Sequence, residues 1–171
     1  MPKVAATDNA RGQWVTETRF AIIGCGFVAD YYMTTLANHP GLALAGVWDR
    51  DEARLRQFCE YHQIKAYESL DEVLRDESVA IVANLTNPES HFEISKAALL
   101  AKKHVYSEKP LALSYREASD LISFAENRHM TICSAPANAL SDAHALVTAN
   151  LGRIGAPRLV YAEMEDGPVF R

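Results

Sequence analysis

Short apolar runs alternate with stretches of helical periodicity along most of the chain. Apolar runs that suit strands buried on both faces occur at residues 20–23, 42–48, 79–83, 104–107 and 130–134. Between them, apolar residues recur at three- and four-residue steps in helices expected to start near residues 27, 51, 69, 87 and 114. Strands that alternate with helices predict right-handed crossovers and a parallel sheet covered on both faces. The expected fold class is therefore α/β, a doubly wound parallel sheet.

Capping residues mark where several of these helices begin. Asp51 is expected to cap the second helix, because its carboxylate can accept an N–H of the first turn. Ser69 with Glu72, and Ser114 with Glu117, have the spacing of a capping box. One further helix has a buried face that we expect to consist of Ile94, Ala97, Ala98 and Ala101.

The two ends of the chain lack this alternation. Residues 1–18 have no periodic pattern, and we interpret them as a flexible leader. Residues 19–138 form the predicted α/β domain. In residues 139–171, a helix expected over 141–151 precedes an extended run, 157–164, which is expected to be a strand leaving the domain. A strand without a partner exposes unpaired N–H and C=O groups, so we expect either that this tail is disordered or that the chain self-associates as a homo-oligomer.

Composition and charge exclude several classes of protein. A formal net charge of −5, with no basic cluster, argues against a nucleic-acid partner. The apolar stretches are too short to span a membrane, so no membrane association is expected. Cys25, Cys59 and Cys133 match no disulfide or metal spacing, which favours reduced thiols in a cytoplasmic protein. The six histidines also lack metal-ligand spacing, and we expect no metal.

A glycine-rich turn follows the first strand. Gly24, Gly26 and Ala29 match the pattern G-x-G-x-x-A between a strand and a helix. Gly24 permits a tight turn, Gly26 lets a pyrophosphate approach the backbone, and Ala29 allows close helix–sheet packing. Phe27 and Val28 open the helix, whose first N–H groups and positive dipole end suit phosphates. A tight strand–helix turn without a ligand would use the same glycines.

An acidic residue at the end of the second strand strengthens the dinucleotide interpretation. Asp49 follows Gly26 by 23 residues and can accept hydrogen bonds from both adenosine ribose hydroxyls. A carboxylate there repels a 2′-phosphate, so NAD is favoured over NADP. The neighbouring Arg50 keeps NADP open, because its guanidinium can receive that phosphate. Asp49 would otherwise be a helix cap, a role that Asp51 can fill.

Three further stretches accompany the glycine turn: residues 47–51 (Val-Trp-Asp-Arg-Asp), 84–91 (Asn-Leu-Thr-Asn-Pro-Glu-Ser-His) and 107–110 (Ser-Glu-Lys-Pro). In order and spacing, from about residue 19 to the end, the chain resembles the Gfo/Idh/MocA oxidoreductases. These act on sugars, inositols, sugar nucleotides and related compounds. The resemblance implies a Rossmann-like NAD(P)-binding domain and a small carbohydrate-like substrate.

The resemblance also implies roles for particular residues. Lys109 would be catalytic, polarising the reacting oxygen during hydride transfer, and Glu108 would lie near a cofactor ribose. A loop beside the cofactor would contain Thr86, Asn87 and Pro88, with Asn87 as a helix cap and Pro88 at the first helical position. His91 is placed with these residues, although packing or capping would also explain it. Without the resemblance, Lys109 would be interpreted as an exposed loop lysine.

The chain departs from the family at its C-terminal end. Members are typically about twice as long and add an α+β substrate domain with a D-x-x-x-H motif, which this chain lacks in the expected region. Residues 139–171 are therefore interpreted as the start of a truncated substrate domain. The leading hypothesis is an NAD(P)-dependent dehydrogenase or reductase, with little or no turnover by these 171 residues alone. The alternative is a non-catalytic dinucleotide-binding module used in sensing or assembly.

Overall fold

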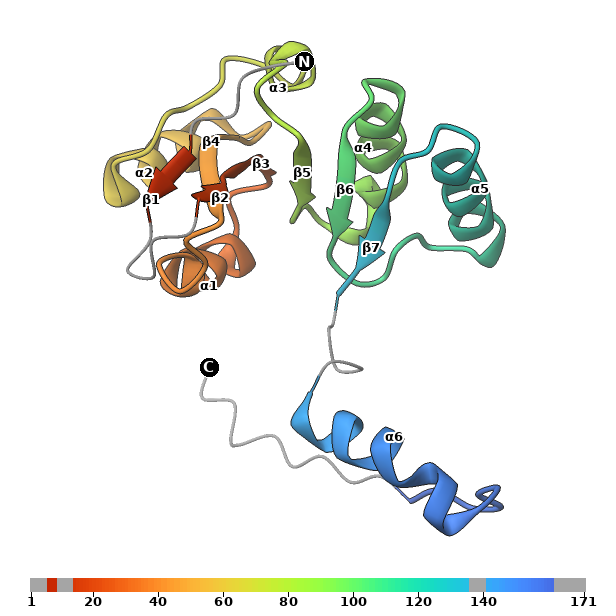
Figure 1. Cartoon of the computed structure of the whole chain (residues 1–171). Coiled ribbons are helices and arrows are strands. Elements are labelled where there is room, and N and C mark those ends of the chain that lie inside the picture. The colour runs from red at the N-terminus through yellow and green to blue at the C-terminus, as the bar shows by residue number, and fades with distance from the viewer. Residues whose placement is uncertain (1–5, 9–13, 136–140, 162–171) are drawn as a thin grey trace, which may run out of the picture. The chain divides into compact units, whose positions relative to one another are not determined.

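The computed structural model of the chain describes residues 6–8, 14–135 and 141–161. The chain divides into two compact units, Met1–Pro136 and Ala137–Arg171, and each is described by itself. In Figure 1 the first unit contains the sheet and helices α1–α5, and the second contains helix α6.

The first unit is built on a five-stranded parallel sheet. Its strands are β3 (Thr18–Ile23), β4 (Leu42–Trp48), β5 (Ile81–Asn84), β6 (His104–Ser107) and β7 (Ile132–Ser134). They lie in the order β4-β3-β5-β6-β7. The chain therefore runs outward from β3 to β4 and then crosses back to place β5 on the other side of β3. This reversal of strand order creates a crevice at the carboxyl ends of β3 and β5, the place where open α/β sheets bind ligands.

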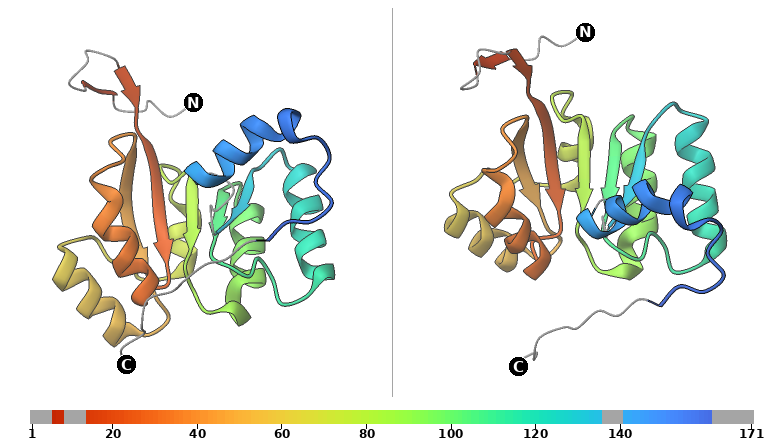
Figure 2. Two further views of the ribbon diagram at one scale, coloured as in Figure 1. Left: turned by 90° about the horizontal axis from the view of Figure 1, so that it is seen from below. Right: turned by 60° about the horizontal axis from the view of Figure 1, so that its bottom comes forward.

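Helices cover both faces of this sheet (Figure 2). They are α1 (Phe27–Leu36), α2 (Glu52–His62), α3 (Leu70–Arg75), α4 (Pro88–Leu100) and α5 (Tyr115–Glu126). Alternate residues of β3 enter different hydrophobic cores, because successive side chains of a strand point to opposite faces. Ala21 and Ile23 pack with residues of α3, α4 and α5, whereas Ile22 packs with residues of α1 and α2. The predicted doubly wound α/β fold is confirmed.

Two of the four predicted helix caps form as expected, and the cap at Asn87 is described with the site. Asp51 caps α2 with its side chain, and Ser114 and Glu117 form a complete capping box at α5. The third prediction is half right. Ser69 Oγ accepts the N–H of Glu72, but the Glu72 carboxylate accepts the N–H of residue 68 in place of that of Ser69.

The buried face of α4 differs from the predicted stripe. Of the predicted set, Ala98 is buried, while Ile94, Ala97 and Ala101 are half-buried. The buried face is formed by His91, Ser95, Ala98 and Leu99. Two of these side chains are polar, so a search for apolar spacing selects the wrong face. Their burial is tolerated because hydrogen bonds from neighbouring elements satisfy them.

The predicted leader contains regular structure. β1 (Ala6–Asp8) pairs with β2 (Trp14–Thr16) as a two-stranded antiparallel sheet. Residues 6–8 and 14–16 of the predicted leader thus form a ladder that the sequence pattern did not indicate. Backbone N–H and C=O groups form the ladder, so short strands can pair without any side-chain periodicity. Two later strands are also shorter than predicted: β5 begins at Ile81 and β7 at Ile132, each two residues late.

The second unit contains α6 (Asp142–Ile154), where Ser141 Oγ accepts the N–H of His144. The strand predicted from residue 157 is not formed over residues 157–161, which have no regular structure, and 162–164 lie outside the described residues. A strand needs a partner for its ladder, and the described residues supply none at this segment. The predicted domain boundary between residues 138 and 139 also falls outside the described ranges. In the described segments, no helix is long and apolar enough to cross a membrane.

Candidate functional site

The turn between β3 and α1 lies directly against the loop that follows β5. Gly24 has a φ of +97°, and a Cβ placed on it would lie 2.7 Å from the carbonyl carbon and oxygen of Leu85. No side chain fits there, and L residues avoid this conformation. Gly24 is therefore required for the close approach of the β3 and β5 loops at the crevice.

Gly26 has a different environment. It is the N-cap residue of α1, with a φ of −89°, and a Cβ placed on it would meet no atom within 4 Å. The space in front of it is open. The N–H groups of Phe27 and Val28, at the start of α1, have no acceptor within the helix and face this end. Ala29 is fully buried against the sheet, as close helix packing requires. Open space at a helix N-terminus suits an anionic ligand.

Asp49 follows β4 and is held in place by backbone donors. Its Oδ2 accepts the N–H of Cys25 at 2.8 Å, and its Oδ1 accepts the N–H of Asp51 at 2.8 Å. The side chain is buried, and Arg54 Nη1 forms an ion pair with Oδ2 at 3.4 Å. Each carboxylate oxygen can accept more than one hydrogen bond. Asp49 thus keeps acceptor capacity at the rim of the glycine turn.

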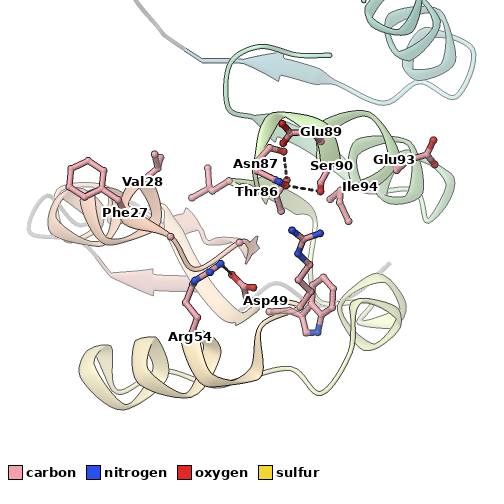
Figure 3. A pocket seen from close by; sticks show the side chains of 15 residues that line it. Phe27, Val28, Asp49, Arg54, Thr86, Asn87, Glu89, Ser90, Glu93 and Ile94 are labelled. Carbon is pink, nitrogen blue, oxygen red and sulfur yellow. Dashed lines mark hydrogen bonds and ion pairs between the residues drawn. The ribbon is translucent and has the colours of Figure 1, made fainter. Parts of the chain in front are cut away.

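A cavity of about 630 Å³ lies in the crevice. Figure 3 shows Phe27 and Val28 on one side of it, Asp49 with Arg54 on another, and Thr86, Asn87 and Ser90 across from them. Gly24, Gly26 and Arg50 also line it. Ala29 is buried beneath the turn and does not face it. The structure thus brings most of the predicted cofactor residues around one cavity, as residues from three strand ends converge there.

The loop after β5 is shaped by Asn84, a fully buried side chain. Its Oδ1 accepts the hydroxyl of Thr86 at 2.7 Å, and its Nδ2 donates to Ser95 Oγ at 3.0 Å. Asn87 is the N-cap residue of α4, with Pro88 following, but its side chain accepts no helix N–H. Its Oδ1 accepts the hydroxyl of Ser90 at 2.8 Å instead. Thr86 and Asn87 line the cavity, and Pro88 starts the helix behind them.

His91 does not face the cavity. Its ring is fully buried, with Nδ1 2.6 Å from the carbonyl oxygen of Pro110 and Nε2 3.0 Å from that of Thr86. His91 is therefore not among the residues that the structure brings together around the cavity. Packing, the other interpretation, fits the structure. The ring joins the loop after β5 to the turn after β6.

The turn after β6 is a separate part of the site. Glu108 donates its N–H to the carbonyl of Asn84 at 2.9 Å, which fixes the start of the turn beside β5. Its Oε1 accepts the hydroxyl of Tyr32 at 3.0 Å, and its Oε2 accepts the N–H of Lys109 at 3.1 Å. Lys109 is exposed. Neither Glu108 nor Lys109 lines the 630 Å³ cavity, so within the first unit the predicted catalytic residue lies apart from it.

Sequence reasoning missed Arg54, together with Ser90, Glu89 and Glu93 on the first turns of α4, all of which line the cavity. Arg54 lies in the first turn of α2, whose N-cap residue Asp51 accepts the N–H of Arg54. Its side chain forms the ion pair with Asp49. It belongs to no motif. In the described ranges, no three histidine, cysteine or acidic side chains come together in a way that would hold a metal ion.

The sheet, the glycine turn and the acidic residue after β4 define the chain as a nucleotide-binding α/β domain of the Rossmann type. Comparison with known families is specific. The model of the Gfo/Idh/MocA oxidoreductase family, described as an NAD-binding Rossmann fold, matches residues 18–135. The chain belongs to this NAD(P)-dependent family, which confirms the resemblance noted in the sequence.

Individual relatives agree with this assignment. A UDP-N-acetylglucosamine 3-dehydrogenase of Acidithiobacillus ferrooxidans is 28% identical over 145 residues, covering 85% of this chain and 44% of the relative. A solved structure of that enzyme has a TM-score of 0.73 at 27% identity, covering 83% of this chain and 45% of the other.

Two solved structures with bound cofactors are also similar. A biliverdin reductase of Synechocystis, in complex with biliverdin and NADP+, has a TM-score of 0.68 at 27% identity, covering 81% of this chain and 44% of the other. A dehydrogenase of Chromobacterium violaceum, in complex with NADH and UDP-GlcNAcA, has a TM-score of 0.71 at 25% identity, covering 80% and 40%. The chain thus spans less than half the length of these relatives.

Proposed function

We propose that this chain binds NAD(P) in the 630 Å³ cavity and is the cofactor-binding part of an oxidoreductase that acts on a carbohydrate-like hydroxyl or ketone. The observation that carries the proposal is the contrast between the two glycines of the turn. Gly24 is glycine because the protein fills the space beside it. Gly26 has no protein atom within 4 Å of its Cβ position, so the open space is available to a ligand.

The residues around the cavity fit the parts of a dinucleotide. The start of α1 offers N–H groups and a positive dipole end to a pyrophosphate. Asp49, fixed by the N–H groups of Cys25 and Asp51, has acceptor capacity for ribose hydroxyls. Its carboxylate favours NAD. Arg54 and Arg50 line the same cavity, and both offer positive charge to a 2′-phosphate, so NADP binding is expected to be weaker but measurable.

The dinucleotide, when bound, supplies a hydride donor or acceptor, and the protein supplies orientation and electrostatics. Lys109 is proposed to donate a hydrogen bond from Nζ to the reacting oxygen of the substrate, which favours the transfer. Glu108 is proposed to bind the hydroxyls of the second ribose of the dinucleotide, the one attached to the nicotinamide. A carbohydrate-like substrate is supported by relatives named for nucleotide sugars. The homo-oligomer stays a prediction.

Calorimetric titration with NAD, NADH, NADP and NADPH tests the proposal. Saturable binding is expected, and Gly26→Ala should weaken it by about tenfold or more, because a methyl group then occupies the phosphate space. Gly152→Ala is the matched control, since its Cβ position is equally open but lies on α6. Asp49→Asn should narrow the preference for NAD over NADP. Failure of all four nucleotides to bind would contradict the proposed function.

A further inference from the structure

Tyr32 connects the helix of the glycine turn to the turn after β6. It lies on α1, six residues after Gly26, and its hydroxyl reaches Glu108 Oε1 at 3.0 Å. The hydroxyl of Tyr106, on β6, lies 2.9 Å from the same Tyr32 oxygen. The two rings meet edge to face, with centroids 6.0 Å apart. No sequence motif marks this contact, because 76 residues separate Tyr32 from Glu108.

The direction of these hydrogen bonds follows from the groups involved. An ionised carboxylate only accepts, so Tyr32 must donate its single hydroxyl proton to Glu108. The Tyr32 oxygen can then only accept from Tyr106. The result is a directed series in which Tyr106 donates to Tyr32 and Tyr32 donates to Glu108. Such a series strengthens each bond, because each hydrogen bond polarises the next.

Tyr32 keeps its proton in this arrangement. Burial, together with donation of its proton to the Glu108 carboxylate and the negative charge of that group, raises the pKa of Tyr32 well above its usual value. Its hydroxyl is therefore a permanent donor rather than an acid or base. The other carboxylate oxygen, Oε2, accepts the N–H of Lys109 at 3.1 Å. Both oxygens of Glu108 are thus fixed, one by α1 and the other by the turn itself.

We propose that Tyr32 is a positioning residue that orients the Glu108 carboxylate for the second ribose of the dinucleotide. The inference rests on the proposed function. Gly26 is the N-cap residue of α1. The same helix would therefore bind the pyrophosphate at its N-terminus and, through Tyr32, orient the carboxylate that receives the second ribose. Fixing a hydrogen-bonding partner in advance lowers the entropic cost of binding.

The test compares NAD with ADP in Tyr32→Phe, by calorimetry on the whole chain. ADP carries the adenosine ribose and the diphosphate but lacks the second ribose. We expect NAD affinity to fall by about three- to tenfold, less than the full contribution of a hydrogen bond to a charged group, because Tyr32 acts through Glu108 and not on the ligand itself. ADP affinity should stay within about twofold, since ADP does not use Glu108. Tyr31→Phe is the matched control, an exposed neighbour on the same helix.

A double-mutant cycle separates positioning from general damage. In a Glu108→Gln background, Tyr32→Phe should cause little further loss of NAD affinity, because its effect passes through the carboxylate. Equal weakening of ADP and NAD would show that Tyr32 only supports α1, and it would overturn the inference. Unchanged NAD affinity would also overturn it. Failure of the unmodified chain to bind either nucleotide would instead refute the proposed function itself.

Discussion

The carboxylate of Asp49 accepts the backbone N–H of Cys25 at 2.8 Å, so the residue after β4 is joined directly to the turn after β3. These residues are 24 apart in sequence and adjacent because β3 and β4 pair in parallel. The bond fixes the shape of the glycine turn and the position of the negative charge together. A change at Asp49 is therefore expected to alter both ribose recognition and the phosphate-binding turn.

Substitution by alanine should lower the stability of the fold at Gly24 but leave it almost unchanged at Gly26. Gly24→Ala introduces a Cβ 2.7 Å from the Leu85 backbone at a φ of +97°. The backbone conformation alone should cost roughly 1–3 kcal/mol of unfolding free energy. Gly26→Ala should leave the unfolding free energy within about 0.5 kcal/mol, because its φ is ordinary and the space is open. Urea denaturation of both variants measures the difference, and equal destabilisation would contradict the assigned environments.

His91→Phe should destabilise the first unit even though it changes no surface residue. The two ring nitrogens lie 2.6 Å and 3.0 Å from the carbonyl oxygens of Pro110 and Thr86. Phenylalanine has no N–H group to donate to either oxygen. Loss of a partly buried hydrogen bond costs roughly 0.5–1.5 kcal/mol. Leu100→Ala, at an exposed residue of the same helix, is the comparison. If His91→Phe unfolds at the same urea concentration as the unmodified chain, the two contacts contribute nothing to stability.

Much of the fold follows from the sequence because strand and helix periods leave different patterns. β4 and β6 have the predicted bounds, and the side-chain caps at Asp51 and Ser114 lie where short-range rules place them. The buried face of α4 could not be predicted in this way. Ser95 is buried because Asn84, eleven residues earlier, donates to it. Apolar spacing carries no information about such a partner.

Some residues of the candidate site could likewise be predicted from the sequence, and others could not. The glycine turn and Asp49 belong to a motif with a characteristic spacing, so the sequence locates them. Arg54 and Tyr32 belong to no motif, and their contacts depend on how α1 and α2 pack on the sheet. Those positions are set by the tertiary fold. The position of Lys109 relative to the cavity likewise depends on the turn after β6, which the spacing of residues does not fix.

Cys25 and Cys133 should differ sharply in their rates of alkylation. Burial, followed by the charge of Asp49, raises the pKa of the Cys25 thiol from 9.0 to about 12. Thiolate is the reactive form, so Cys25 should stay unmodified by iodoacetamide at pH 8. Cys133, which is exposed, should be modified first. Peptide mass spectrometry over time measures the order. Early labelling of Cys25 in the folded chain would contradict its burial.

Acid should remove a stabilising interaction at Asp76, which lies before β5. Burial favours the protonated carboxyl, but hydrogen bonds from Ser78 and from the hydroxyl of Tyr67 outweigh it and lower the pKa of Asp76 below its ordinary value of 3.8. The folded state therefore binds this proton less readily than the unfolded state. The contribution to stability is fully present above pH 3.8 and is lost as the pH falls through the lowered pKa.

Urea denaturation of Asp76→Asn and of the unmodified chain, between pH 6 and pH 3, measures this loss of stability. The variant should be less stable than the unmodified chain at pH 6, and the difference should shrink below the ordinary carboxyl pKa of 3.8. Tyr67→Phe removes the 2.7 Å hydrogen bond to the same carboxylate and should reduce the pH dependence in the same window. Asp71→Asn is the control, because its ion pair with Arg75 is 70% exposed on the Asp71 side and surface pairs contribute little. A difference between Asp76→Asn and the unmodified chain that stays constant from pH 6 to pH 3 would show that the carboxylate is not stabilised by its partners.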